Sequence, residues 1–334
     1  MTIAVEISSV DLVVVRLPIL MYHYVRPNSK RISERHHILS LDLFDQQLDL
    51  MAKKYDFILG NDLLALNKDD AALENKIWLT FDDGYRDCID YVLPSLLKKG
   101  ATATVFIPTE AIFERKLLDV TKIHLLLSSS KSVGEIISAS RQYYLDANFE
   151  SDVGESFDQL YTRYGFPNVY NDSDNHFVKN LFQKLSPIWV RKKFLDHIFK
   201  LFVQRSESSW ADELYMSPDD VSYLSENGIE FGTHGHSHEW LANLPDEDQA
   251  NELTKSFQFL DTVTDSRTNR LIAYPFGSYS EKTLEIARSL GVQIGVVHRG
   301  AKLAELNSDA KEYLELDRID IMFFDKFMNG EFNQ

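Results

Sequence analysis

The sequence predicts an α/β fold with a parallel sheet, built either as a (β/α) barrel or as a doubly wound sheet. Residues 77–81, 85–99 and 101–108 have the pattern of a strand, a helix and a strand, which together form a βαβ unit. The same alternation resumes at residue 217 and continues to a last strand at 319–321. Strand–helix alternation repeated over this length is the basis for the fold class.

The segment between these two regions, residues 112–216, carries mostly helical patterns. Its clearest feature is a wide apolar face that repeats at helical spacing. This face consists of Phe177, Leu181, Phe182, Leu185, Phe194, Leu195, Ile198, Phe199 and Phe202. We interpret it as a face that packs on neighbouring helices or on the main body, with a surface for a partner or a substrate lipid as the alternative. We therefore predict one domain over 1–334 with a helical insertion at 112–216, and an oligomer could form through this insertion.

The first elements come before the βαβ unit. Residues 12–15 and 17–21 are apolar stretches on either side of Arg16, and Pro18 marks the start of the second strand because it cannot donate to a sheet ladder. This strand is predicted to run on through Tyr22-His23-Tyr24-Val25. Residues 28–37 are polar and basic and predict a loop, in which His36 and His37 are solvated or, alternatively, touch a substrate. A helix over 43–51, a strand at 57–59 and an Asp-rich helix at 62–70 follow.

The later elements have start and stop signals. Pro94 is expected to kink the helix over 85–99, and Gly100 ends it. Ser217 and Pro218 open a helix as the N-cap and the first residue. The predicted elements after this helix are a strand at 229–232, a helix at 247–262, a strand at 271–274, a helix at 280–290 and a strand at 292–297.

Composition excludes several classes of protein. A formal net charge of −16 and a pI near 5.0 argue against nucleic acid as the main partner and against broad adhesion to anionic membranes. The one cysteine, Cys88, allows neither an internal disulfide nor a thiolate metal cluster. Residues 10–20 are apolar but carry Asp11 and Arg16 and are too short to span a bilayer. We therefore predict a cytoplasmic protein without an integral membrane segment.

Two adjacent carboxylates end the strand at 77–81, in Thr80-Phe81-Asp82-Asp83-Gly84. A buried pair of like charges is costly unless a cation lies nearby. Gly84 allows a sharp turn that brings the backbone close to whatever Asp82 and Asp83 hold. The alternative is a strand end whose acids cap the next helix.

Three histidines follow about 150 residues later, in Gly232-Thr233-His234-Gly235-His236-Ser237-His238. His234 and His238 are four residues apart, so their rings can converge on one helical face or in a tight turn. Two imidazoles and one carboxylate suit a zinc-like ion and leave a coordination position for water. His236 points away from the other two, and we predict a structural role for it.

These two motifs, followed by Tyr274-Pro275-Phe276-Gly277, resemble the successive motifs of the polysaccharide deacetylases, the NodB-like group or carbohydrate esterase family four. The motifs cover roughly residues 77–110 and 217–320, and the first two are specific in combination. The resemblance implies a distorted (β/α) barrel of about seven strands with a helical insertion, with the site at the C-terminal rim. It also implies a hydrolase that removes N-acetyl groups from amino sugars of an oligo- or polysaccharide, or of a glycan precursor.

The resemblance assigns roles to particular residues. Asp83, His234 and His238 would hold one divalent ion, most simply zinc, although cobalt, nickel or iron could bind the same ligands. Asp82 would be the general base for a water that the metal activates. The Phe276 N–H would stabilise the oxyanion, with Tyr85 and Pro275 also beside the substrate.

The general acid and the partner of the base are less determined. The stretch 18–24, with His23, resembles the biofilm poly-N-acetylglucosamine deacetylases, in which an N-terminal strand supplies the acid. His298 is the alternative acid. Most members of the family have an arginine that tethers the base two residues before the proline of the third motif, where this chain has Ala273. What orients Asp82 therefore stays open.

Two other functions use the same residues. One is a glycan-binding protein that kept the barrel without catalysis, which the intact Asp82, Asp83, His234 and His238 disfavour. The other keeps the chemistry but changes the substrate, as in a deformylase or another hydrolase of C–N bonds. Because we predict a cytoplasmic protein, a lipid-linked or soluble biosynthetic intermediate suits it better as substrate than an extracellular polymer.

Overall fold

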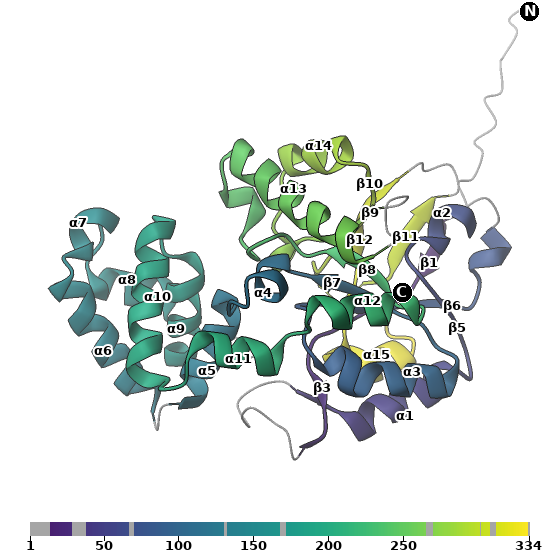
Figure 1. Cartoon of the computed structure of the whole chain (residues 1–334), viewed down its shortest axis with the longest axis horizontal. Helices are drawn as coiled ribbons and strands as arrows, with labels where there is room; N and C mark the ends of the chain where they lie inside the picture. The colour runs from purple at the N-terminus through teal and green to yellow at the C-terminus, as the bar shows by residue number, and fades with distance from the viewer. Residues whose placement is uncertain are drawn as a thin grey trace, which may run out of the picture. The chain divides into compact units, whose positions relative to one another are not determined.

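The computed structural model describes residues 14–28, 38–66, 70–129, 132–167, 172–264, 270–300, 302–307 and 312–332. The chain divides into two compact units, one of residues 1–25, 42–109 and 216–334, the other of residues 26–41 and 110–215 (Figure 1). The second unit contains the predicted insertion except for Met216. His36, His37 and residues 12–13 of the predicted first strand lie outside the described residues. That the whole chain is one domain stays a prediction.

The first unit is built on a nearly closed sheet of parallel strands. The strand order is β12-β10-β9-β8-β7-β6-β2-β13, and β5 pairs beside β6. The strands are β2 (Ile19–Tyr22), β5 (Asp56–Ile58), β6 (Lys76–Phe81), β7 (Thr104–Ile107), β8 (Glu230–Thr233), β9 (Arg270–Ala273), β10 (Val292–Val297), β12 (Tyr313–Asp317) and β13 (Ile319–Asp320). The two ends of this order, β12 and β13, are separated only by Arg318, which nearly closes the barrel. The predicted distorted (β/α) barrel is confirmed, with eight described strands around it.

Two short strands form a separate two-stranded sheet. β1 (Val14–Leu17) pairs antiparallel with β11 (Ala304–Asn307). Leu17 and Leu306 from this pair join Trp78, Phe106 and Leu271 in the barrel core. Sequence patterns indicated neither β11 nor β12, because charged residues interrupt the apolar ones in both. This omission matters for the site, since Arg318 directly follows β12.

Helices flank the strands of the first unit. They are α1 (Leu41–Met51), α2 (Asp62–Leu66), α3 (Leu93–Lys99), α12 (Pro218–Glu226), α13 (Asp246–Val263), α14 (Glu281–Ser289) and α15 (Phe324–Met328). The predicted helix over 85–99 is a π-helix over Cys88–Val92 that continues into α3. Pro94 explains the change, because its ring would clash with the carbonyl of Asp90 in a regular α-helix and a wider turn relieves the clash. Gly100, at φ +62°, ends α3 as predicted.

The second unit is helical. Its main helices are α5 (Asp119–Ser129), α6 (Val133–Asp146), α7 (Phe149–Val153), α8 (Phe157–Tyr164), α9 (Ser173–Lys184), α10 (Ile188–Phe202) and α11 (Glu207–Leu214). The apolar face of α9 and α10 is buried among these helices, so the interpretation as packing between neighbouring helices holds. None of the helices in the described ranges has the length and apolarity needed to cross a membrane.

Gly232, in β8, allows the histidine motif to approach the barrel core. A Cβ atom at this position would lie 2.5 Å from the Phe106 ring and 3.0 Å from the carbonyl oxygen of Leu271. We expect Gly232→Ala to destabilise the protein by about 1–3 kcal/mol, the usual cost of overpacking a core, as measured by urea unfolding. Gly134→Ala, in α6, is the matched control. Its nearest neighbouring atom is 3.9 Å away, so it should leave stability equal or slightly higher.

Candidate active site

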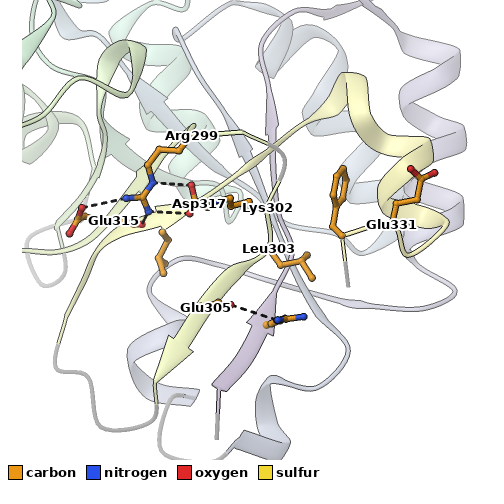
Figure 2. A pocket seen from close by; sticks show the side chains of 10 residues that line it. Arg299, Lys302, Leu303, Glu305, Glu315, Asp317 and Glu331 are labelled. Carbon is orange, nitrogen blue, oxygen red and sulfur yellow. Dashed lines mark hydrogen bonds and ion pairs between the residues drawn. The ribbon is translucent and has the colours of Figure 1, made fainter. Parts of the chain in front are cut away.

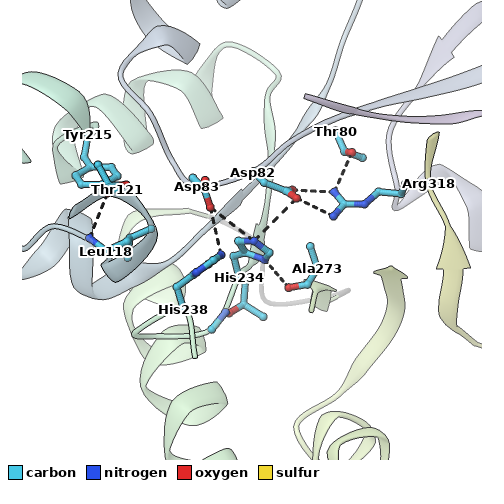
Figure 3. A network of polar contacts seen from close by, with 12 residues as sticks. Thr80, Asp82, Asp83, Leu118, Thr121, Tyr215, His234, His238, Ala273 and Arg318 are labelled. Carbon is cyan, nitrogen blue, oxygen red and sulfur yellow. Dashed lines mark hydrogen bonds and ion pairs between the residues drawn. The ribbon is translucent and has the colours of Figure 1, made fainter. Parts of the chain in front are cut away.

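The predicted site residues follow the carboxyl ends of neighbouring barrel strands. Asp82 and Asp83 follow β6, His234 follows β8, Phe276 follows β9 and His23 follows β2. In a parallel barrel these ends meet at one rim, where substrates bind. Figure 3 shows the side chains of Asp82, Asp83, His234 and His238 directed toward one another.

Three of these side chains form a cluster that fits a metal ion. Asp83 Oδ1 lies 3.4 Å from His238 Nε2 and 3.8 Å from His234 Nε2. Two nitrogen or oxygen ligands of a tetrahedral zinc ion stand roughly 3.3–3.5 Å apart. Asp83 Oδ1 is also buried without a hydrogen-bond partner in the described chain. A buried carboxylate oxygen without a partner is costly, and a cation between these three groups would remove that cost.

The histidine loop is tied to α13 by one acid. Glu252 accepts hydrogen bonds from the backbone N–H groups of His236 at 2.9 Å and Ser237 at 2.8 Å, and from the Ser237 hydroxyl at 2.7 Å. His236 turns away from the cluster, and its Nδ1 lies 2.9 Å from Thr109 Oγ1. Glu252 therefore sets the path of the loop that presents His234 and His238.

Three non-glycine residues at the site have a left-handed backbone. They are Asp83 at φ +71°, His238 at φ +59° and Phe276 at φ +56°. This conformation costs roughly 1–2 kcal/mol for a residue with a Cβ, so it persists only where the surroundings enforce it. Such strain concentrated at one rim is typical of a functional site.

Asp82 is held by a residue that the sequence did not single out, Arg318. The guanidinium donates two hydrogen bonds of 2.7 Å to the Asp82 carboxylate and one of 3.1 Å to Thr80 Oγ1 (Figure 3). Both side chains are only 2% exposed. Arg318 thus tethers Asp82 in a chain where Ala273 occupies the usual arginine position. The available signal was indirect: an acid buried in the barrel needs a cation, and Arg318 is the cation that comes just before the last predicted strand.

Opposing effects set the pKa of Asp82. Burial raises the pKa of this carboxyl. The charges of Arg318 and His234, together with the Arg318 hydrogen bonds, lower the pKa by more than burial raises it. The net pKa lies well below the usual range for Asp. Asp82 is therefore ionised throughout the neutral pH range.

The two candidate acids occupy different places. β2 and β6 pair in parallel with Tyr22 opposite Phe81, and the Asp82 N–H donates to Tyr22 O at 2.9 Å. His23 therefore follows β2 at the level of Asp82, and its charge lowers the pKa of both Asp82 and His238. His298 follows β10, where its backbone oxygen lies against Gly277.

The three residues predicted beside the substrate differ in exposure. Tyr85 is fully buried and stacks on Tyr24 at 4.0 Å between ring centroids. Pro275 is buried, whereas Phe276 is half-buried next to His238. The N–H groups of Gly277 and Ser278 close the turn, and the Phe276 N–H has no acceptor among the described residues. Phe276 thus has a free donor at the rim, while the Tyr85 ring packs on Tyr24, the residue that follows His23.

A charged pocket of about 550 Å³ lies elsewhere on the first unit and contains none of the predicted site residues (Figure 2). Within it Arg299 donates to both oxygens of Asp317, at 3.1 and 3.0 Å, and to Glu315 O at 2.8 Å. These bonds join the segment after β10 to the end of β12. They therefore help to fix the chain immediately before Arg318.

The metal-free protein should lose stability as the pH falls from about 6.5 to about 4. Burial lowers the pKa of His234 and His238 from 6.5 to about 4, more than the charge of Asp82 raises it. The unfolded chain then binds more protons than the folded one across this window, so stability rises with pH, by about 1.4 kcal/mol per unit of pKa shift. Urea unfolding of chelator-treated protein between pH 4.5 and 7 checks this. A variant with both histidines changed to glutamine should show a flatter profile, and an equally steep one would contradict the assignment.

The chain is similar in sequence or in fold to several known proteins. The family model for "Polysaccharide deacetylase" matches residues 69–124 and 155–295, more than half of the chain. The deacetylase PplD of Streptococcus pyogenes, solved with acetate, is 21% identical with a TM-score of 0.54, covering 92% of both chains. IcaB of Ammonifex degensii is 16% identical with a TM-score of 0.55, covering 94% of this chain and 96% of that one. The putative polysaccharide deacetylase YxkH of Bacillus subtilis is 29% identical over 82 residues, which span 29% of its length.

The fold and the site together define a barrel protein with a group of candidate metal ligands and a tethered carboxylate at its C-terminal rim. The family match covers the strands that carry Asp82, Asp83, His234 and Phe276. The chain belongs to the polysaccharide deacetylase family, the NodB-like carbohydrate esterase family four.

Proposed function

We propose that this protein hydrolyses the N-acetyl group of amino sugars in an oligo- or polysaccharide, with one divalent metal ion held by Asp83, His234 and His238. The observation that carries the proposal is the partnerless, buried Asp83 oxygen facing the Nε2 atoms of both histidines. Zinc suits this donor set best. When bound, such an ion would polarise the amide carbonyl and increase the acidity of water.

The other steps of the proposed reaction are carried out by residues of the chain. Asp82 accepts a proton as the water oxygen bonds to the amide carbon, and Arg318 keeps that carboxylate ionised and fixed. The Phe276 N–H donates to the oxygen on which negative charge develops. His23 then donates a proton to the sugar nitrogen as the C–N bond breaks, which releases acetate and a free amine. The register of β2 with β6 favours His23 over His298 for this step.

The low pKa of Asp82 is consistent with its role. A base must be ionised before the reaction, and Arg318 ensures this at any neutral pH. A lipid-linked or soluble biosynthetic intermediate as the substrate, and a cytoplasmic location, stay predictions.

The test is acetate release from a panel of N-acetylated oligosaccharides. Protein stripped with a chelator is assayed before and after reloading with zinc, and Asp82→Asn serves as a catalytically impaired control. We expect zinc-dependent release by the wild type and a loss of about 10²-fold or more in the variant. Zinc binding without release of acetate from any substrate would contradict deacetylation. Formate release from N-formylated sugars, or glycan binding without turnover, would identify the deformylase or the binding protein instead.

A further inference from the structure

The two predicted metal-binding imidazoles are oriented in different ways. His234 Nδ1 lies 2.6 Å from the carbonyl oxygen of Ala273, which fixes the proton on Nδ1 and directs Nε2 to the cluster. The ring of His238 forms no hydrogen bond within the described part of the chain; its polar neighbour is Asp83, at 3.4 Å. Metal-binding histidines almost always have a hydrogen-bonded partner on the second ring nitrogen. Among the described residues, the His238 ring is instead in contact with other rings.

An aromatic stack provides that contact. The Phe276 ring lies 4.6 Å from the His238 ring, at an interplanar angle of 67°. Trp240 lies on Phe276 in parallel, at 4.4 Å and 6°. The three rings therefore form a continuous row, edge-to-face between His238 and Phe276 and stacked between Phe276 and Trp240, which we call the aromatic stack. Contacts of this kind contribute about 0.5–1.5 kcal/mol per pair beyond apolar burial.

The backbone on both sides of the stack is held in place. Trp240 directly precedes a 3₁₀ helix over Leu241–Asn243, in which Leu241 is fully buried. The Ala242 N–H donates to Ser278 Oγ at 3.2 Å, so the loop after His238 is bonded to the loop after Phe276. The two inner members of the stack, His238 and Phe276, are also two of the residues with a left-handed backbone. The stack therefore joins two strained residues whose positions matter for the proposed reaction.

We propose that Trp240 is a positioning residue for the metal site. It holds the Phe276 ring, and through Phe276 it fixes the imidazole of His238 and the peptide N–H that faces the developing oxyanion. Trp240 itself touches no reacting atom. The inference rests on the proposed function, because it assumes that His238 is a metal ligand.

Zinc affinity tests the inference without relying on activity. Wild type, Trp240→Ala, Trp240→Phe and Trp240→Leu are compared by competition with a chromogenic chelator, and by the visible absorption spectrum after loading with Co²⁺. Trp189→Ala is the control, because it removes an exposed indole from the other unit. We expect Trp240→Ala and Trp240→Leu to weaken zinc binding by about 10-fold or more and to change the Co²⁺ spectrum. Trp240→Phe keeps a flat ring and should restore most of the affinity.

The outcomes separate this inference from the function on which it rests. Unchanged zinc affinity and an unchanged Co²⁺ spectrum in Trp240→Ala would overturn the positioning role, whatever happens to turnover. Equal weakening by Trp189→Ala would overturn it as well, because the effect would then reflect general destabilisation. If Trp240→Ala does not fold, Trp240→Leu retains the apolar volume and decides the question. Failure of the wild type to bind zinc would refute the proposed function first, and the inference with it.

Discussion

Replacing His234 with alanine is expected to abolish both zinc binding and acetate release. The substitution removes one of three ligands from a buried cluster and leaves Asp83 Oδ1 with only one imidazole neighbour. Loss of a group that only hydrogen-bonds to a metal ligand weakens metal binding by about 10–100-fold, so loss of a ligand itself should exceed about 10²-fold. Isothermal titration with zinc measures the first effect, and acetate release at saturating zinc measures the second.

His236→Ala is the matched control for this experiment. It removes the same side chain from the same loop, but its ring faces Thr109 and is not part of the cluster. We expect a stability loss of about 1 kcal/mol from the missing hydrogen bond, with zinc affinity essentially retained. Zinc binding that survives in His234→Ala, or that is lost equally in His236→Ala, would exclude the proposed ligand set.

Replacing Arg318 with methionine is expected to produce the largest loss of stability. The variant keeps an apolar side chain of similar length but leaves the Asp82 carboxylate buried without its counterion. Breaking a buried pair in this way costs about 3–5 kcal/mol. Turnover should fall as well, because the carboxylate loses the two hydrogen bonds that fix its direction. Urea unfolding and acetate release report the two effects.

The pH dependence of the Arg318→Met variant identifies the cause. In the wild type the pKa of Asp82 is depressed, so its contribution to stability is present above the unfolded pKa and is lost only as the pH falls through the folded value. Without Arg318, burial dominates and raises that pKa. The stability gap between variant and wild type should therefore narrow as the pH is lowered toward 4.

Adding Asp82→Asn to Arg318→Met completes the cycle. The double variant has no buried charge at this position, so it should be more stable at pH 7 than Arg318→Met alone. It should remain inactive, because asparagine cannot accept the proton. A double variant that is less stable than Arg318→Met would contradict the view that the unpaired Asp82 carboxylate causes the loss of stability.

Much of the site could be predicted because its chemistry lies in short motifs. Asp82 and Asp83 are adjacent, and His234 and His238 are four residues apart, so each motif carries its own spacing. The glycines beside these residues indicate turns, and the structure has a left-handed backbone at two of them, Gly235 at φ +75° and Gly277 at φ +65°. The candidate ligands and the turns that present them can therefore both be predicted from short stretches of sequence.

The partner of Asp82 could not be predicted in the same way. Arg318 is 236 residues from Asp82 in the chain and has no motif around it. It reaches the carboxylate only because β12 and β13 close the barrel, and the acids among the apolar residues of β12 leave no apolar run by which to recognise a strand. The role proposed for Trp240 could not be predicted from the sequence either, because its contact with Phe276 depends on two loops that meet at the rim.

The sequence by itself determined the family, the barrel class, and the identity of the candidate base and metal ligands. These depend on residue types at fixed local spacing, which strand and turn geometry preserve in any member of the fold. Only the tertiary structure decided what holds those groups in place: Arg318 on Asp82, Ala273 O on His234, and the aromatic stack on His238. Long-range contacts of this kind depend on how the barrel closes, and no local pattern of residues encodes that closure.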